Sequence, residues 1–213
     1  MIIAFDVQNF GSVKERQRLS FEAEKSDHLE EYYVFEAAKG VRLLKLGLIY
    51  GANASGKSTI LKALGFLRDL VLNPEEKKTD KLNFSPFLFD PNTPKQNSIL
   101  SVEFLQNHVR YYYEVEFNRN AIIKERLDYY NPTKANIFKR DTDLDSEFSR
   151  ITFGSKIKTD KASEKTLASN TLWNNTVLGG FLKTNIELKE LKDVIDWFSK
   201  HMRSIIVSTT GLD

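Results

Sequence analysis

The sequence contains no cysteine, which excludes disulfide bonds and thiolate metal sites and fits a reducing cytosol. It also lacks any apolar run that approaches the roughly 18 residues of a membrane-spanning helix. The apolar residues 1–5 are followed at once by Asp6, so they form neither a signal peptide nor a membrane span. From these absences we expect a soluble cytoplasmic protein that does not contact a membrane.

Neither sign of charge predominates in the chain. There are 31 basic and 29 acidic residues and the net charge is +2, so composition offers no case for a nucleic-acid partner, although a local basic patch stays open. With 41% hydrophobic and 28% charged residues, this is an ordinary globular chain that can bury a core. Its 213 residues allow one large domain or two small ones.

Several catalytic arrangements are also absent from the sequence. The three histidines, His28, His108 and His201, lack metal-ligand spacing. Neither a G-x-S-x-G motif nor a histidine-paired nucleophile occurs. The sequence therefore does not indicate a serine-type hydrolase or a histidine-based metal enzyme.

The sequence does contain a phosphate-binding P-loop, or Walker A motif. Residues 51–58 read G-A-N-A-S-G-K-S, which matches G-x-x-x-x-G-K-S. Glycines let the backbone turn tightly around a polyphosphate, and successive N–H groups form a concave anion site. In such a site Lys57, the candidate catalytic residue, reaches the β- and γ-phosphates, and the Ser58 hydroxyl binds Mg²⁺. The predicted ATP-binding residues are Gly51, Ala52, Asn53, Ala54, Ser55, Gly56, Lys57, Ser58 and Thr59.

The segments on either side of the P-loop agree with this prediction. Residues 41–50 are apolar and strand-like and end at Gly51. After the motif, apolar residues recur with a helical period at Ile60, Leu64, Leu67 and Val71. Asn73-Pro74 ends this helix. The phosphates would then lie at the positive end of the helix, as in α/β P-loop NTPases.

Two β-rich regions surround the P-loop in the sequence. Residues 3–7 alternate in polarity, and residues 18–22 are typical of a returning strand, which predicts a β-hairpin. Residues 100–138 predict a meander of about four antiparallel strands with one buried face. The tyrosines of this meander could stack on bases, but a spacing of two favours packing on the buried face.

The last third of the chain is predicted to be mostly helical. Thr184 and Glu187 fit a capping box, followed by a stripe of apolar residues from Leu188 to Phe198. Leu178-Gly179-Gly180 is interpreted as a turn, because leucine stands where the ABC signature motif has serine. Residues 204–208 predict a short buried strand.

A Walker B motif, which places an aspartate at the end of an apolar strand to bind Mg²⁺, is missing. Residues 205–207 form an apolar run without a following carboxylate, and Leu88-Phe89-Asp90 is short and flanked by prolines. The chain is therefore typical of the nucleotide-binding front part of an ATPase.

Together, Asn9-Phe10-x-Ser12, Leu19-Ser20-Phe21 and residues 50–64 resemble the bacterial ABC-type AAA ATPases, relatives of the RecF, SMC and OLD heads. Residues 86–90, the tyrosine-rich meander and Asp196-Trp197-Phe198 are similar to the branch found in anti-phage systems such as PARIS and Septu.

This resemblance implies a single N-terminal lobe over residues 1–213, an α/β P-loop NTPase fold with an antiparallel β-layer. Its parts are the hairpin, P-loop strand and helix (1–73), the antiparallel meander (74–163), and a helical segment with a short strand (164–213). Family members carry the signature, Walker B and switch histidine in a C-terminal half, which we expect to be absent here. ATP hydrolysis (EC 3.6.-) is accordingly expected for a full-length protein rather than for this chain alone.

The resemblance also implies ATP and Mg²⁺ as cofactors, and homo-oligomers in which two heads sandwich ATP. Gln96 is a candidate for the family's Q-loop glutamine, and Asn9, Phe10 and Ser12 resemble the segment near adenine or ribose, or form a simple hairpin turn. Our first hypothesis is an ATP-driven switch that controls a nuclease or toxin. The alternatives are a DNA-binding or DNA-end-processing head like those of SMC and RecF, and a transporter ATPase subunit.

Overall fold

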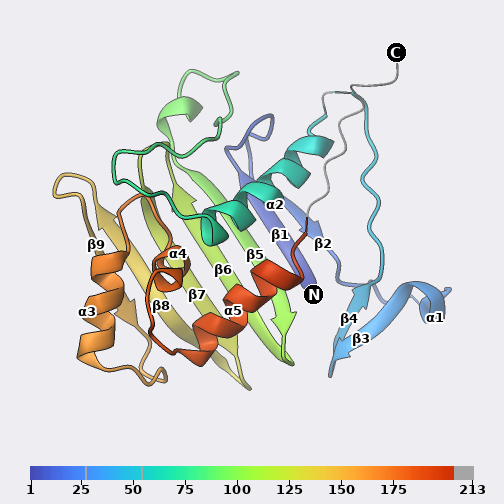
Figure 1. Ribbon diagram of the computed structural model, residues 1–213. Coiled ribbons are helices and arrows are strands. Elements are labelled where there is room, and N and C mark those ends of the chain that lie inside the picture. Colours follow the sequence, from blue (N-terminus) through green and yellow to red (C-terminus); the bar gives the residue numbers. More distant parts are fainter. Residues whose placement is uncertain (27, 54, 204–213) are drawn as a thin grey trace, which may run out of the picture.

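One seven-stranded antiparallel sheet forms the centre of the fold, in the order β2-β1-β5-β6-β7-β8-β9 (Figure 1). The structure is a computed structural model that describes residues 1–26, 28–53 and 55–203. The strands of the sheet are β1 Ile2–Gln8, β2 Gln17–Ser20, β5 Ser98–Gln106, β6 Val109–Phe117, β7 Ile122–Tyr130, β8 Lys134–Asp143 and β9 Phe148–Phe153. This is the mixed α/β architecture with an antiparallel β-layer that the sequence predicts.

The predicted opening hairpin and meander are confirmed, and they share one sheet because β1 pairs with β5. The four strands expected over 100–138 are β5 to β8, and the short strand that residues 150–153 allow is longer, because Phe148–Phe153 pairs as β9 with β8. Alternation along β6 sends Tyr111 and Tyr113 into the core and leaves Tyr112 on the opposite face. Two of the three tyrosines of this run are thus packing residues, as their spacing indicates.

Helices cover the buried face of the sheet. They are α2 Lys57–Leu72, α3 Lys161–Asn170, α4 Val177–Leu182 and α5 Lys189–Lys200, and Figure 1 shows α2 and α5 crossing that face. The apolar stripe predicted for α5 is buried, including Phe198; in that of α2, Leu67 and Val71 are buried and Ile60 and Leu64 pack partly buried against the core. Trp197 stacks on Phe104 of β5 with ring centroids 3.8 Å apart, which fixes α5 against the centre of the sheet.

A buried ion pair joins the helical layer to the far half of the sheet. Arg140 of β8 and Glu125 of β7 are fully buried, with Nη1 and Oε2 3.6 Å apart. Arg140 also donates hydrogen bonds to the carbonyls of Trp173 and Asn175, and Glu125 accepts one from the amide of Val177 at 2.7 Å. Burial raises the pKa of Glu125 and lowers the pKa of Arg140. The pair thereby holds the segment that leads into α4.

The predicted strand over residues 41–50 is wrong in its second half. Only Val41–Leu44 forms a strand, β4, and it pairs with β3 Val34–Ala38, which follows the short helix α1 Glu30–Tyr33. Residues 46–50 lie in no strand, and the side chains of Leu46, Leu48 and Tyr50 are 59%, 65% and 83% exposed. A strand needs a neighbour for its backbone groups, and β3 ends its pairing at Leu44.

Two predictions in the last third are also wrong. Thr184 does not cap α5, which begins after Leu188 without a side-chain cap; instead the Thr184 hydroxyl donates to the carbonyl of Phe181 at the end of α4. Leu178-Gly179-Gly180 is helical rather than a turn, because Thr176 caps α4 by accepting the Gly179 amide at 2.9 Å. The strand predicted over 204–208 lies outside the described residues.

Residues 84–90, which the sequence predicts as an edge or irregular strand, form no strand, and Asn92 precedes the short 3-10 helix η1 Thr93–Lys95. Within the ranges that the structure describes, no helix combines the length and apolar character needed to cross a bilayer.

Candidate functional site

The P-loop leads directly into α2, as the motif requires. Gly56 is the residue before the helix and has a φ of 93°, a left-handed conformation that favours glycine. Its carbonyl accepts the amides of Thr59 at 3.0 Å and Ile60 at 3.2 Å, which starts the helix. The free N–H groups and the dipole of a 16-residue helix therefore point towards the loop, where they favour an anion.

The predicted site residues lie together in this loop and the first helical turn. Gly51, Ala52, Asn53, Ser55 and Ser58 are exposed, whereas Gly56, Lys57 and Thr59 are partly buried. Ala54 lies outside the described residues. The exposed residues face solvent, from which a nucleotide would arrive.

Lys57 is turned back onto its own loop. Its Nζ donates hydrogen bonds to the carbonyl oxygens of Gly51 and Ala52, both at 2.7 Å. The ammonium group therefore lies beside the loop rather than on a carboxylate elsewhere in the fold. Rotation of this flexible side chain would exchange two carbonyl acceptors for phosphate oxygens, which bind an ammonium more strongly.

The residues present fit Mg²⁺ only in combination with a nucleotide. Within the described part of the chain, no group of three or more His, Cys, Asp or Glu side chains is arranged to hold a metal ion. Mg²⁺ is commonly held by one or two protein ligands together with substrate phosphates and water. The exposed hydroxyl of Ser58, next to Lys57, suits that role.

A second segment forms a wall of the site, which the motif alone did not reveal. The turn between β1 and β2 places the Ser12 hydroxyl 2.7 Å from the Thr59 hydroxyl. A Cβ on Gly11, which has a φ of 56°, would lie 2.8 Å from the Thr59 methyl group, and one on Gly56 would lie 3.2 Å from the Ser12 hydroxyl. Only glycine fits these close approaches without displacement.

The Walker B candidate Asp90 is engaged in another interaction. Its carboxylate lies 2.9 Å from Nζ of Lys14, and it also accepts the Asn92 amide at 2.8 Å. The hydrogen bond from Lys14, with that from Asn92, lowers the pKa of Asp90. The backbone carbonyl of the Q-loop candidate Gln96 accepts a hydrogen bond from Nδ2 of Asn9, in the β1–β2 turn, at 3.0 Å.

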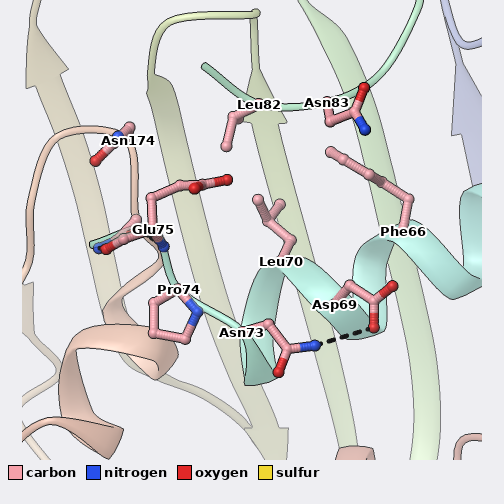
Figure 2. A pocket seen from close by; sticks show the side chains of 10 residues that line it. Phe66, Asp69, Leu70, Asn73, Pro74, Glu75, Leu82, Asn83 and Asn174 are labelled. Carbon is pink, nitrogen blue, oxygen red and sulfur yellow. Dashed lines mark hydrogen bonds between the residues drawn. The ribbon is translucent and has the colours of Figure 1, made fainter. Parts of the chain in front are cut away.

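A separate cavity lies at the other end of α2 (Figure 2). It has a volume of about 190 Å³, and its lining includes Asp69, Asn73 and Glu75 with apolar Phe66 and Leu70. It is far along α2 from Lys57, the first residue of the helix. The cavity is therefore distinct from the P-loop.

A comparison with protein families finds a family whose model covers both the P-loop and the β-meander. The model described as AAA domain, AbiEii toxin-like, type IV toxin–antitoxin system matches residues 48–173, more than half of the chain. The chain belongs to this family. A comparison with curated proteins gave no match.

Membership makes the chain an AAA domain of the P-loop ATPase type, with ATP binding as its shared property. The matched region contains all of the predicted nucleotide-binding residues, the whole meander from β5 to β9, and α3. The resemblance to AAA-type ATPases is thus confirmed, and the similarity to the PARIS and Septu branch stays a prediction.

Proposed function

We propose that this AAA domain binds ATP with Mg²⁺ at residues 51–59 and acts as a nucleotide-driven switch for a nuclease or toxin partner in anti-phage defence. The observation that carries the proposal is the placement of Gly56, Lys57 and Ser58 at the N-terminus of α2. There, backbone N–H groups, one ammonium and one hydroxyl converge on a site for a triphosphate and its metal. No guanine-recognition motif of the Asn-Lys-x-Asp type occurs in the sequence, which favours ATP.

Two copies of the domain would sandwich the nucleotide between them. This part of the proposal is supported by the exposure of Gly51, Asn53 and Ser55, which leaves one side of the loop open to a second head. It also follows from the resemblance, in which the opposite head completes each ATP site. The second head and the partner would then report whether ATP is bound.

A binding measurement with matched lysine variants tests the proposal. Titration calorimetry with Mg²⁺ and the slowly hydrolysed analogue ATPγS should show saturable binding by the wild type. Replacing Lys57 by alanine should weaken this binding roughly 10- to 100-fold, because charge-assisted hydrogen bonds to phosphate are lost. Lys62→Ala, which removes an exposed lysine from the same helix, is the control and should bind normally. Equal binding by the wild type and Lys57→Ala would overturn the proposal.

The oligomer is tested by measuring molar mass with light scattering, with and without the analogue. A mass that doubles only with nucleotide supports sandwiched heads, and an unchanged mass at saturating nucleotide contradicts them. A salt titration of DNA binding separates the switch from a DNA-processing head, because phosphate contacts weaken steeply with salt.

A further inference from the structure

We infer that Asn9 is a positioning residue for the nucleotide site: through the turn 9–13 it sets the position of Ser12 against Thr59, and thereby the affinity for MgATP. The inference rests on the proposed function of residues 51–59. It adds a residue that lies outside the P-loop and links the site to the segment 85–97.

The Asn9 side chain is a buried connection between two distant parts of the chain. It is 2% exposed, and its Nδ2 donates to the carbonyls of Thr93 at 2.9 Å, Gln96 at 3.0 Å and Asn97 at 3.3 Å. Its Oδ1 accepts the amide of Phe87 at 3.0 Å. A single side chain thus satisfies four backbone groups that lie 78 or more residues away in sequence.

The backbone of Asn9 is held in a conformation that starts the turn. Its φ is 51°, in the left-handed region, where asparagine is tolerated better than most residues. Its carbonyl accepts the Ser98 hydroxyl at 2.5 Å, and its amide donates to the carbonyl of Lys14 at 3.0 Å. Two residues later, the amide of Gly11 donates to the carbonyl of Ser85 at 2.8 Å. Both ends of the turn are therefore fixed.

The turn meets the nucleotide site at Thr59. The hydroxyls of Ser12 and Thr59 are 2.7 Å apart, and Gly11 lies so close to the Thr59 methyl group that no Cβ would fit. A hydroxyl can accept one hydrogen bond while it donates another. Ser12 can therefore donate to Thr59 and leave the Thr59 proton directed at a phosphate oxygen. Displacement of the turn would remove this orientation of the Thr59 hydroxyl without changing any residue of the P-loop.

A merely structural role for Asn9 makes a different prediction. Loss of its hydrogen bonds would then lower the free energy of unfolding, but the folded fraction would bind nucleotide as before. The positioning role requires that affinity falls in the folded protein, and that the effect depends on Thr59. Residues that act through one contact have non-additive effects, which a double-mutant cycle measures.

The test uses Asn9→Gly, which keeps the left-handed backbone accessible and removes all four side-chain hydrogen bonds. The matched control is Asn136→Ala, because Nδ2 of Asn136 also donates to three oxygens, in Leu127, Asp128 and Phe138, but lies on β8. Binding of Mg²⁺ and ATPγS is measured by calorimetry in wild type, both variants, Thr59→Val and the Asn9→Gly/Thr59→Val double variant. Urea unfolding of each protein gives its stability.

We expect Asn9→Gly to weaken nucleotide binding about tenfold. Asn136→Ala should lose a similar amount of stability but keep an affinity within about twofold of the wild type. In the Thr59→Val background, the loss of affinity caused by Asn9→Gly should be smaller. Unchanged affinity in Asn9→Gly, or equal losses in Asn9→Gly and Asn136→Ala, would overturn the inference alone. Absence of binding in the wild type would overturn the proposed function first and the inference with it. If Asn9→Gly does not fold, Ser12→Ala replaces it: weaker binding supports the inference, and wild-type affinity overturns it.

Discussion

The Nζ of Lys57 lies 2.7 Å from the carbonyl oxygen of Gly51, six residues earlier in the chain. The hydrogen bond closes the phosphate-binding loop on itself. Because both groups belong to the loop, the contact adds nothing to the packing of α2 against the sheet. The ammonium group of Lys57 can thus move from the loop carbonyls to a ligand without changing the packing of the core.

This separation of function from stability can be measured. We expect Lys57→Ala to change the free energy of unfolding by less than about 0.5 kcal/mol, as for surface positions away from buried contacts, although it weakens nucleotide binding. Urea unfolding monitored by the fluorescence of Trp173 and Trp197 is a suitable measurement. A stability loss above about 2 kcal/mol would show that the lysine is part of the fold.

Glycine at position 11 is required by two physical constraints. We expect Gly11→Ala to lower stability by about 2–3 kcal/mol, since a left-handed φ of 56° and a clash with Thr59 both oppose a methyl group. The same substitution should weaken MgATP binding, because Thr59 must move.

The control for this substitution is Gly40→Ala. Gly40 also has a positive φ, 76°, but nothing lies within 4 Å of an added Cβ. Only the unfavourable left-handed backbone conformation then opposes alanine, so the expected loss in the free energy of unfolding is about 1 kcal/mol. Equal costs at the two positions, measured by urea unfolding, would contradict the close contact between the turn and α2.

Removal of one partner of the buried Arg140–Glu125 ion pair should lower the stability of the fold more than most single substitutions. Arg140→Met leaves the carboxylate of Glu125 buried and unpaired, and frees the carbonyls of Trp173 and Asn175. We expect a loss of about 3–5 kcal/mol in the free energy of unfolding. Lys200→Ala, which removes an exposed i,i+4 pair with Asp196, should cost no more than about 0.5 kcal/mol. A small effect of Arg140→Met would mean that the segment before α4 is held by other contacts.

The start of α3 should give a stability that depends on acidic pH. Asp160 caps this helix, and hydrogen bonds from the Ser163 hydroxyl and from the Ser163 and Ala162 amides lower its pKa. The cap stabilises fully above the unfolded pKa of about 3.9, and this contribution is lost as pH falls through the lower folded pKa.

Asp160→Asn separates the charge from the cap. Asparagine is an equally good N-cap but does not titrate, so the stability difference between wild type and Asp160→Asn should shift against the wild type as pH falls from 7 towards 3. Thermal unfolding at both ends of this range checks the prediction. A difference that stays constant with pH would contradict the assigned cause.

The apolar segment before the P-loop should affect association more than folding. Leu46 and Leu48 are 59% and 65% exposed, so the double variant Leu46→Ser/Leu48→Ser should change stability by less than about 0.5 kcal/mol. It should reduce self-association at high concentration, because exposed apolar patches promote contact between molecules. Light scattering at rising concentration measures this. A large loss of stability would mean that the segment is packed in solution.

Local patterns in the sequence were reliable where one stretch of chain contains all the interacting groups. The P-loop motif, the apolar stripe of α2 and the stop at Asn73-Pro74 could be predicted because turn, helix and cap involve neighbours in sequence. The same holds for the alternation of Tyr111 and Tyr113 along β6. These predictions depended on backbone geometry and hydrophobic period alone.

Local patterns failed where a distant partner decides between alternatives. Residues 41–50 have strand character throughout, but only the part opposite β3 is paired. Thr184 fits a capping box with Glu187, but its hydroxyl donates to the carbonyl of Phe181 at the end of α4, and α5 begins after Leu188 without a side-chain cap. The family resemblance pointed to Asn9 as a residue near the nucleotide, but its buried hydrogen bonds could not be predicted, because its partners lie 78 or more residues away in sequence.

By itself, then, the sequence determined that a triphosphate-binding loop precedes a helix and that an antiparallel meander follows, since these depend on spacing within short segments. Only the tertiary structure decided that the β1–β2 turn contacts Thr59 through Ser12, and that Asn9 connects this turn to residues 87–97. The physical reason is that hydrogen bonds between distant segments form only after the sheet has brought β1 next to β5.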